Sequence, residues 1–203
     1  MSNKKDHRLE RLIFFSDAVI AIAITLLIIE IHVPHLTPGD NHAALQQLEE
    51  LLPSFFGFIV SFTVIGRFWL GHSAALGGMS GYDERLFRPN LLLLMAIVIM
   101  PFSTALLSSN LGHLVAATVY NITLTLTSLA SLAVIWIATD PLSGKSEHSP
   151  EERSGLRNRG TIVVIAALTC ILLGLFQPAF SQLPMFAIIF ADRILNKLQR
   201  KRP

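Results

Sequence analysis

The stretch RLIFFSDAVIAIAITLLIIEIHV, residues 11–33, decides the fold class of this chain. It is long enough for a helix that crosses the ~30 Å hydrocarbon core of a bilayer, which takes ~20 apolar residues. Its polar members are Ser16, Asp17 and Thr25 within the run, and Arg11 and Glu30 near its ends. An ionisable side chain inside a membrane helix is costly, so we expect Asp17 to face protein or water rather than lipid.

Further apolar runs follow, and together they predict an all-α, polytopic membrane protein. Only 15% of the 203 residues are charged, whereas a soluble domain has about 25%. We predict six membrane-spanning helices, over about residues 9–33, 48–70, 90–108, 114–138, 160–176 and 183–196. The whole chain, residues 1–203, is expected to form a single transmembrane domain.

The basic residues predict the orientation of these helices. All sixteen Lys and Arg residues fall on one side of the six-span arrangement, and the loops at 34–47, 109–113 and 177–183 have none. By the positive-inside rule, we expect a multi-pass protein of the cell (plasma) membrane with both termini in the cytoplasm. Residues 140–158 are then a cytoplasmic loop and residues 197–203 a basic cytoplasmic tail. Topology explains the tail without a nucleic-acid partner, and its contact with anionic membrane lipid stays open.

Apolar residues of the first span repeat at alternating spacings of four and three: Phe15, Val19, Ile22, Leu26, Ile29 and Val33. This seam is typical of helices packed around a common axis. At ~100° per residue, Asp17 lies roughly 140° from Ile22 and should point towards neighbouring helices, whereas Thr25 lies about 60° away. Two arrangements fit the seam. The first helix is the central core helix of a monomeric bundle, or several copies of it line a pore with stacked apolar rings.

These residues carry a resemblance to a known family. Arg11 with Phe15-Ser16-Asp17, followed by Ala21-Ile22 and Thr25-Leu26-Leu27, resembles the first-helix signature RxxxFSD…AI…TLL of the transmembrane protein 175 family. That family comprises endolysosomal potassium channels of animals and shorter prokaryotic relatives. Its second- and third-helix motifs resemble Trp69 with His72, Arg85-Leu86-Phe87, Asn90 and Pro101-Phe102-Ser103-Thr104. The resemblance covers about residues 9–108, and it departs at Ser73, where many relatives have a second histidine.

The resemblance implies a potassium-selective cation channel with a hydrophobic constriction on helix one instead of a carbonyl filter. The residues that would form the pore constriction and set selectivity are Ile22, Leu26, Ile29 and Thr25. Because this chain has one repeat, the resemblance implies a homotetramer around a central pore that passes K⁺ and other monovalent cations. No cofactor and no resident metal are implied, only transient K⁺ in the pore.

The family's polar cluster behind the pore helix corresponds here to Arg11, Ser16, Asp17, Trp69 and His72, which would brace that helix. Simpler explanations stay open for each of them. Ser16 and Thr25 could bond to the backbone of their own helix. Asp17 could be an acid favoured near a helix N-terminus, and His72 could be an interfacial histidine with no special role.

Signatures of catalysis are missing from the sequence, and we therefore do not expect an enzyme. There is no GxSxG, HExxH, CxxC or P-loop, and the seven histidines are scattered. Two other functions stay open: a proton-coupled secondary transporter that uses Asp17, and a non-transporting membrane scaffold. Against the transporter, the first helix contains no Gly or Pro that would break it near a midplane site.

Overall fold

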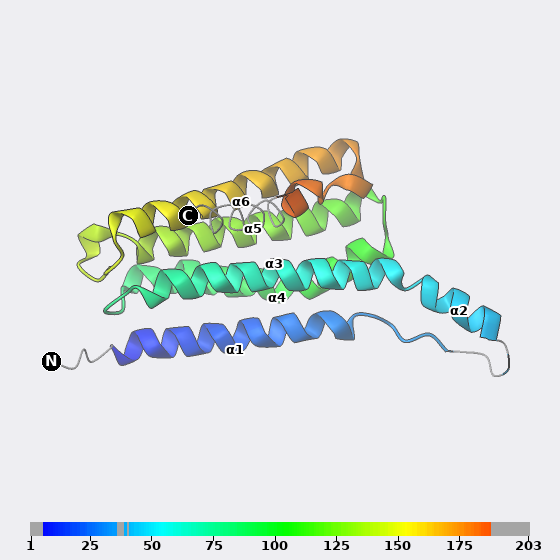
Figure 1. Ribbon diagram of the computed structural model, residues 1–203, viewed down its shortest axis with the longest axis horizontal. Coiled ribbons are helices and arrows are strands. Elements are labelled where there is room, and N and C mark those ends of the chain that lie inside the picture. Colours follow the sequence, from blue (N-terminus) through cyan, green and yellow to red (C-terminus); the bar gives the residue numbers. More distant parts are fainter. Residues whose placement is uncertain (1–5, 36–38, 40, 188–203) are drawn as a thin grey trace, which may run out of the picture.

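The computed structural model describes residues 6–35, 39 and 41–187, and this part of the chain is all-α. Its long helices are α1 (His7–Ile29), α3 (Leu52–Gly77), α4 (Phe87–Ser109), α5 (Leu114–Ala138) and α6 (Pro150–Phe176). These five are long and apolar enough to cross a membrane. They run side by side in one bundle, with α1 at one edge and α6 at the opposite edge (Figure 1). The polytopic helical architecture expected from the sequence is confirmed.

The second span differs from its prediction at both ends. A short helix, α2 (Asn41–Glu49), precedes it, has no buried residue and projects beyond the bundle (Figure 1). α3 then begins at Leu52, with Pro53 in its first turn, and continues past the predicted end at residue 70 to Gly77. The helix continues because its last two turns contribute buried apolar side chains, Ala75 and Leu76, to the core.

Part of the predicted loop at 140–158 is helical, because α6 begins at Pro150. The Ser149 hydroxyl accepts the N–H of Glu152, and the Glu152 carboxylate accepts the N–H of Ser149 at 2.8 Å. This reciprocal pair is a capping box, and proline suits the first helical position because its missing N–H would have had no partner there. The loop prediction is therefore wrong from residue 150 onward: the polar composition belongs to the first turns of a helix.

Past α6 the chain turns back through η3 (Pro178–Phe180). Asn121 of α5 holds this turn, since it accepts a hydrogen bond from Gln182 at 2.6 Å and donates one to the Cys170 carbonyl at 2.9 Å. Residues 183–187 are helical, as the start of the predicted sixth span requires. The rest of that span and the basic tail at 197–203 lie outside the described residues.

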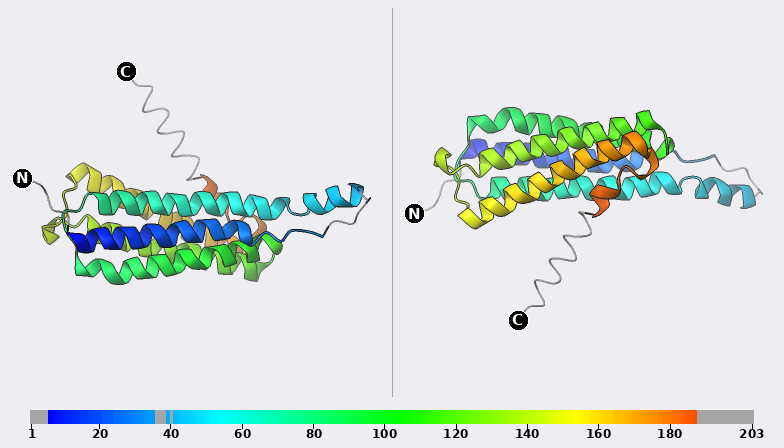
Figure 2. Two further views of the ribbon diagram at one scale, coloured as in Figure 1. Left: turned by 90° about the horizontal axis from the view of Figure 1, so that it is seen from below. Right: turned by 90° about the horizontal axis from the view of Figure 1, so that it is seen from above.

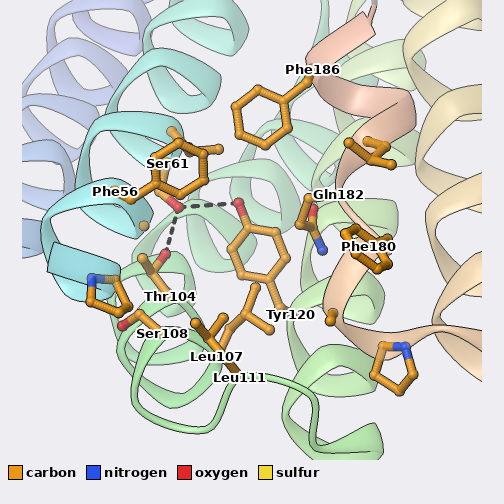
Figure 3. A pocket seen from close by; sticks show the side chains of 16 residues that line it. Phe56, Ser61, Thr104, Leu107, Ser108, Leu111, Tyr120, Phe180, Gln182 and Phe186 are labelled. Atoms are coloured by element: carbon orange, nitrogen blue, oxygen red, sulfur yellow. Dashed lines mark hydrogen bonds between the residues drawn. The ribbon is translucent and has the colours of Figure 1, made fainter. Parts of the chain in front are cut away.

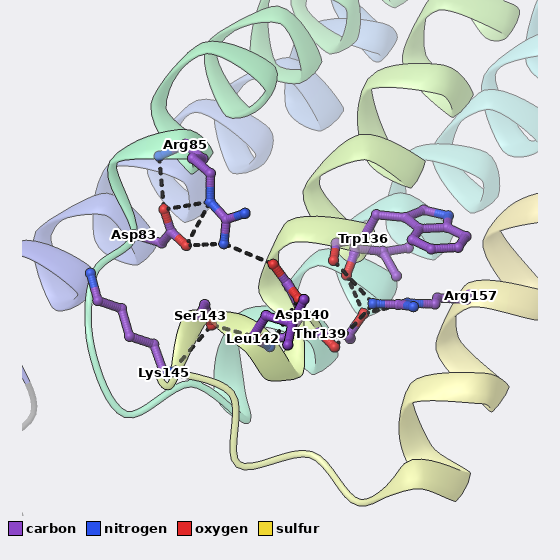
Figure 4. Close-up of polar contacts among 10 residues, drawn as sticks. Asp83, Arg85, Trp136, Thr139, Asp140, Leu142, Ser143, Lys145 and Arg157 are labelled. Atoms are coloured by element: carbon purple, nitrogen blue, oxygen red, sulfur yellow. Dashed lines mark hydrogen bonds and ion pairs between the residues drawn. The ribbon is translucent and has the colours of Figure 1, made fainter.

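The loops at the end of the bundle where α1 begins are tied to one another. Asp6 caps α1, and its second carboxylate oxygen accepts the N–H of Tyr82 at 3.2 Å. Arg85 donates to Asp83 at 2.8 Å and to Asp140 at 2.9 Å, which joins the α3–α4 loop to the end of α5 (Figure 4). We call this the basic end, because the described loops at the opposite end contain no Lys or Arg.

Candidate functional site

The two faces of α1 have opposite environments. Its buried face packs against α3 and α4 and consists of Leu9, Ser16, Ile20, Ala23 and Leu27. The predicted seam lies on the other face: Phe15 is 53% exposed, Ile22 60%, Leu26 37% and Ile29 70%. Figure 2 (left) shows α1 at the surface, between α3 and α4. The first helix is therefore not the central core helix of this subunit, and that alternative is wrong.

A chain of buried hydrogen bonds holds α1 against α3 and α4. His72 Nε2 donates to Asn90 Oδ1 at 2.8 Å, and Asn90 Nδ2 donates to Ser16 Oγ at 2.9 Å. The Ser16 hydroxyl then donates to the Leu12 carbonyl at 2.8 Å. Because Asn90 donates to Ser16 through Nδ2, its Oδ1 faces His72 and can only accept. His72 Nε2 is therefore the donor, so a neutral His72 carries its ring proton on Nε2. His72 is only 1% exposed, so it is not an interfacial histidine.

Asp17 and Trp69 form a second contact between α1 and α3. The indole Nε1 donates to Asp17 Oδ1 at 2.9 Å. Because the acceptor is a carboxylate, this is a charge-assisted hydrogen bond, roughly twice as strong as a neutral one. As the helical wheel predicted, the acid points off the seam and towards a neighbouring helix.

Arg11 does not join these contacts. It is exposed and forms no hydrogen bond or ion pair with any residue in the described part of the chain. On the helical wheel it lies about 20° from Ile22, so it extends the exposed face instead of the buried one. The described residues of one subunit thus include no partner through which Arg11 would brace the pore helix, and that role stays a prediction.

Thr25 also lies on the exposed face of α1. Its hydroxyl donates to the Ile22 carbonyl one turn earlier at 2.8 Å. This is the hydrogen bond to the backbone of its own helix that the sequence left as an alternative. Its side chain is exposed beside Ile22 and Leu26 all the same.

Asn90 is the buried polar residue that sequence reasoning missed as a site residue. It connects His72 to Ser16 and so links α3, α4 and α1. The sequence contains a signal for this role. Asn90 is an amide directly before the run LLLL, in a helix that is otherwise apolar over several turns. A polar group there needs a partner on another helix, because lipid offers none.

A cavity of about 540 Å³ lies between α3, α4, α5 and η3, towards the end opposite the basic end (Figure 3). Ser61, Thr104 and Tyr120 pair their hydroxyls with one another, at 2.7 Å and 3.1 Å. The described lining residues include no Asp, Glu, Lys or Arg. This cavity therefore offers no charged group for an ion, and within the described residues no cluster of His, Cys, Asp or Glu could hold a metal.

Comparison with known proteins agrees with the motifs on α1, α3 and α4. The family model described as "Endosomal/lysosomal potassium channel TMEM175" matches residues 11–101. The fold superposes with a TM-score of 0.76 on the crystal structure of a lysosomal potassium-selective channel TMEM175 homolog from Chamaesiphon minutus, at 27% identity, covering 97% of this chain and 100% of that one. Over residues 11–101 the chain resembles the TMEM175 family, and its fold matches that of a TMEM175 homolog. That family consists of ion channels and not of enzymes.

Two bacterial relatives match part of this chain. A protein from Streptomyces collinus, named as a potassium channel, is 40% identical over 131 residues, which is 62% of either chain. Another, from Chamaesiphon minutus and also named as a potassium channel, is 41% identical over 109 residues, covering 52% of this chain and 54% of that protein. The matched region thus spans less than two thirds of these relatives.

Proposed function

We propose that this chain is one subunit of a homotetrameric, potassium-selective cation channel in which α1 lines a central pore. Ile22, Leu26 and Ile29 form stacked apolar rings, and Thr25 helps to shape selectivity beside them. The names of two relatives and of the matched structure, all potassium channels, support this proposal. The permeant ions are K⁺ and, less favourably, other monovalent cations.

The observation that carries the proposal is the placement of the seam on the exposed face of α1. In a bilayer, contact with lipid requires an apolar surface but no alternation of four and three residues. The opposite face is fixed to α3 and α4 by His72, Asn90 and Ser16. One face of α1 is thus fixed within the subunit, and the other presents a packing seam. Such a helix is suited to pack against α1 of other subunits.

Apolar rings can act on ions without a carbonyl filter. A narrow ring of Ile22 side chains offers no oxygen ligands, so an ion has to shed water to pass. Shedding water costs less for K⁺ than for Na⁺, because the larger ion holds its hydration shell less tightly. The same rings can close the pore by expelling water, which would make selectivity and gating properties of one surface.

The proposed orientation has both termini in the cytoplasm of a bacterial-type cell membrane, with lipid around the outer helices. Support comes from the described basic residues: Arg85 and Lys145 lie between the helices at the basic end and Arg153 in the first turn of α6, whereas the loops at the other end carry none. The positive-inside rule assigns the basic end to the cytoplasm.

The variant Ile22→Asn tests this function in liposomes that contain the purified protein. A polar ring lowers the dehydration cost, so we expect the reversal potential under a K⁺/Na⁺ gradient to move towards that of an unselective pore. Ile59→Asn is the matched control: Ile59 is 59% exposed against 60% for Ile22. Both lie seven residues from the end of their helix away from the basic end, so their depth is similar.

An unchanged reversal potential in Ile22→Asn, or an equal change in Ile59→Asn, would remove Ile22 from the selective ring. The same liposomes separate the competing functions. Proton movement in fixed stoichiometry with K⁺ would indicate a coupled transporter. No K⁺ flux under any gradient, from protein that is assembled and monodisperse, would indicate a scaffold.

A further inference from the structure

A groove of about 230 Å³ lies between α3, α5 and α6, on the side of the bundle away from α1. Arg67 of α3 and Arg159 of α6 both line it, and both are exposed. Its described lining residues include no Asp or Glu. Arg159 forms no hydrogen bond or ion pair with the described residues, so its charge is not compensated there. Arg159 therefore gives the groove a positive charge.

The walls of this groove are apolar or small. Phe68, Ile135 and Val163 supply hydrophobic surface from the three helices. Gly71 lines the groove on α3, and a Cβ placed at this position would enter open space, with nothing within 4 Å. The site thus pairs two cations with a hydrocarbon-like trough, which is the chemical pattern of a molecule with an anionic head and an apolar tail.

The two arginines lie at similar depths, in the half of the bundle nearer the basic end. α3 has 26 residues and α6 has 27, so each is about 40 Å long and exceeds the ~30 Å hydrocarbon core. Arg67 and Arg159 lie about 15 Å and about 14 Å from the basic ends of their helices. An arginine side chain at that depth extends towards the interface while its methylene stem stays in the apolar region.

We infer that this groove binds an anionic phospholipid, with its phosphate on Arg67 and Arg159 and an acyl chain along the trough. Guanidinium groups bind phosphate through two parallel hydrogen bonds. Basic pockets between membrane helices are also where anionic headgroups bind. The site is separate from the α1 seam, so it holds whether or not α1 lines a pore.

The test measures how much phosphatidylglycerol raises the thermal stability of the full chain after delipidation in detergent. Phosphatidylcholine with the same acyl chains and inorganic phosphate alone are measured in parallel. We expect a shift with phosphatidylglycerol only, because both the charge and the chain are needed. A shift with phosphate alone would indicate a simple anion site, and an equal shift with phosphatidylcholine would overturn the charge assignment.

Variants locate the effect. Arg159→Gln should weaken the apparent affinity for phosphatidylglycerol about tenfold, the effect of losing one charged hydrogen-bonding group. Arg153→Gln removes the same charge from the same helix, outside the groove, and should leave the affinity unchanged. Equal effects of these two variants would overturn the site and leave only general attraction of charge.

Two further variants keep the test decisive if Arg159→Gln does not fold. Gly71→Leu fills the trough and keeps both arginines, so it should abolish the shift by blocking the acyl chain. Arg159→Lys keeps the charge and should retain part of the affinity. Native mass spectrometry of each variant, counting bound phosphatidylglycerol per subunit, checks the same conclusion, and undiminished lipid binding by Gly71→Leu contradicts it.

Discussion

Asn90 shows how one side chain fixes the position of α1. Its amide accepts from His72 and donates to Ser16, and all three groups are buried among three helices. A buried donor or acceptor that loses its partner costs more than the hydrogen bond itself contributed, since neither lipid nor protein replaces water there. His72 Nδ1 already has no partner among the described residues, so this histidine depends on the bond from Nε2.

Asn90→Leu should therefore destabilise the protein by about 1–3 kcal/mol, because leucine fills the space but leaves His72 Nε2 unpaired. Thermal unfolding in detergent measures the loss. Asn158→Leu is the control, since Asn158 is an exposed asparagine whose contact with Ser154 is 3.5 Å long. Replacing His72 and Asn90 together should cost less than the sum of the two single changes. Additive costs would show that the two residues are not coupled.

At the scale of the elements, capping and loop contacts decide where helices end. α6 begins at a capping box that holds Ser149 and Glu152 together. The α3–α4 loop is attached to the end of α5 through Arg85, which contacts Asp83 and Asp140. Neither feature involves membrane hydropathy, which explains why the apolar runs placed the middles of the helices correctly and missed these ends.

Ser149→Ala should destabilise the first turn of α6 by about 1 kcal/mol, because the N–H of Glu152 loses its acceptor. Hydrogen exchange at residues 152–156 should become faster, while exchange in the middle of α6 stays unchanged. Ser154→Ala, an exposed serine one turn later in the same helix, is the control and should change exchange little. Equal acceleration in both variants would rule out a specific role for the cap.

Arg85 predicts how stability depends on pH. Its guanidinium lowers the pKa of Asp83, and for Asp140 the N–H of Leu142 and then Arg85 lower the pKa. A carboxyl whose pKa is lowered on folding adds stability that is complete above its ordinary pKa of 3.8 and is lost as the pH falls through the lowered value. The contacts of Arg85 with these two aspartates should therefore stabilise the protein at pH 7 and not in strong acid.

Arg85→Gln should accordingly be less stable than the natural protein at pH 7, and the difference should close as the pH falls below 3.8. High salt should reduce the difference, because the Arg85 guanidinium is exposed and its interactions are partly screened. Chemical denaturation at several pH values measures it. Arg88→Gln removes an equal charge from an exposed position and should show no such closing difference.

At the scale of the whole molecule, the subunit exposes its most regular apolar surface. Of the apolar α1 segment that could span a membrane, 22% is buried, against 50% in α4 and 56% in α5. α4 and α5 therefore form the interior of the subunit, and α1 lies at its edge. If copies associate through α1, the seam becomes the centre of the assembly while α6, at the opposite edge, faces lipid.

Cysteine cross-linking tests this assembly. Ile22→Cys should give a covalent dimer band in mild oxidant, because rings of residue 22 would bring copies together at the axis. Ile59→Cys, equally exposed on α3, should stay monomeric on the same gel. The natural Cys170 is fully buried and should not react. Light scattering on the uncrosslinked protein should give the mass of a tetramer; a monomeric mass, or equal cross-linking at both positions, would contradict the arrangement.

The sequence by itself determined that the chain is a helical membrane protein that resembles the TMEM175 family, because hydropathy and the RxxxFSD motif are local patterns. It also determined that Asp17 points off the seam, since one helix has only one periodicity. Only the tertiary structure decided that the seam faces outward, that Asn90 joins His72 to Ser16, and that Arg11 stays apart from them. These facts depend on which helices meet and at what rotation, and that depends on packing between residues far apart in the chain.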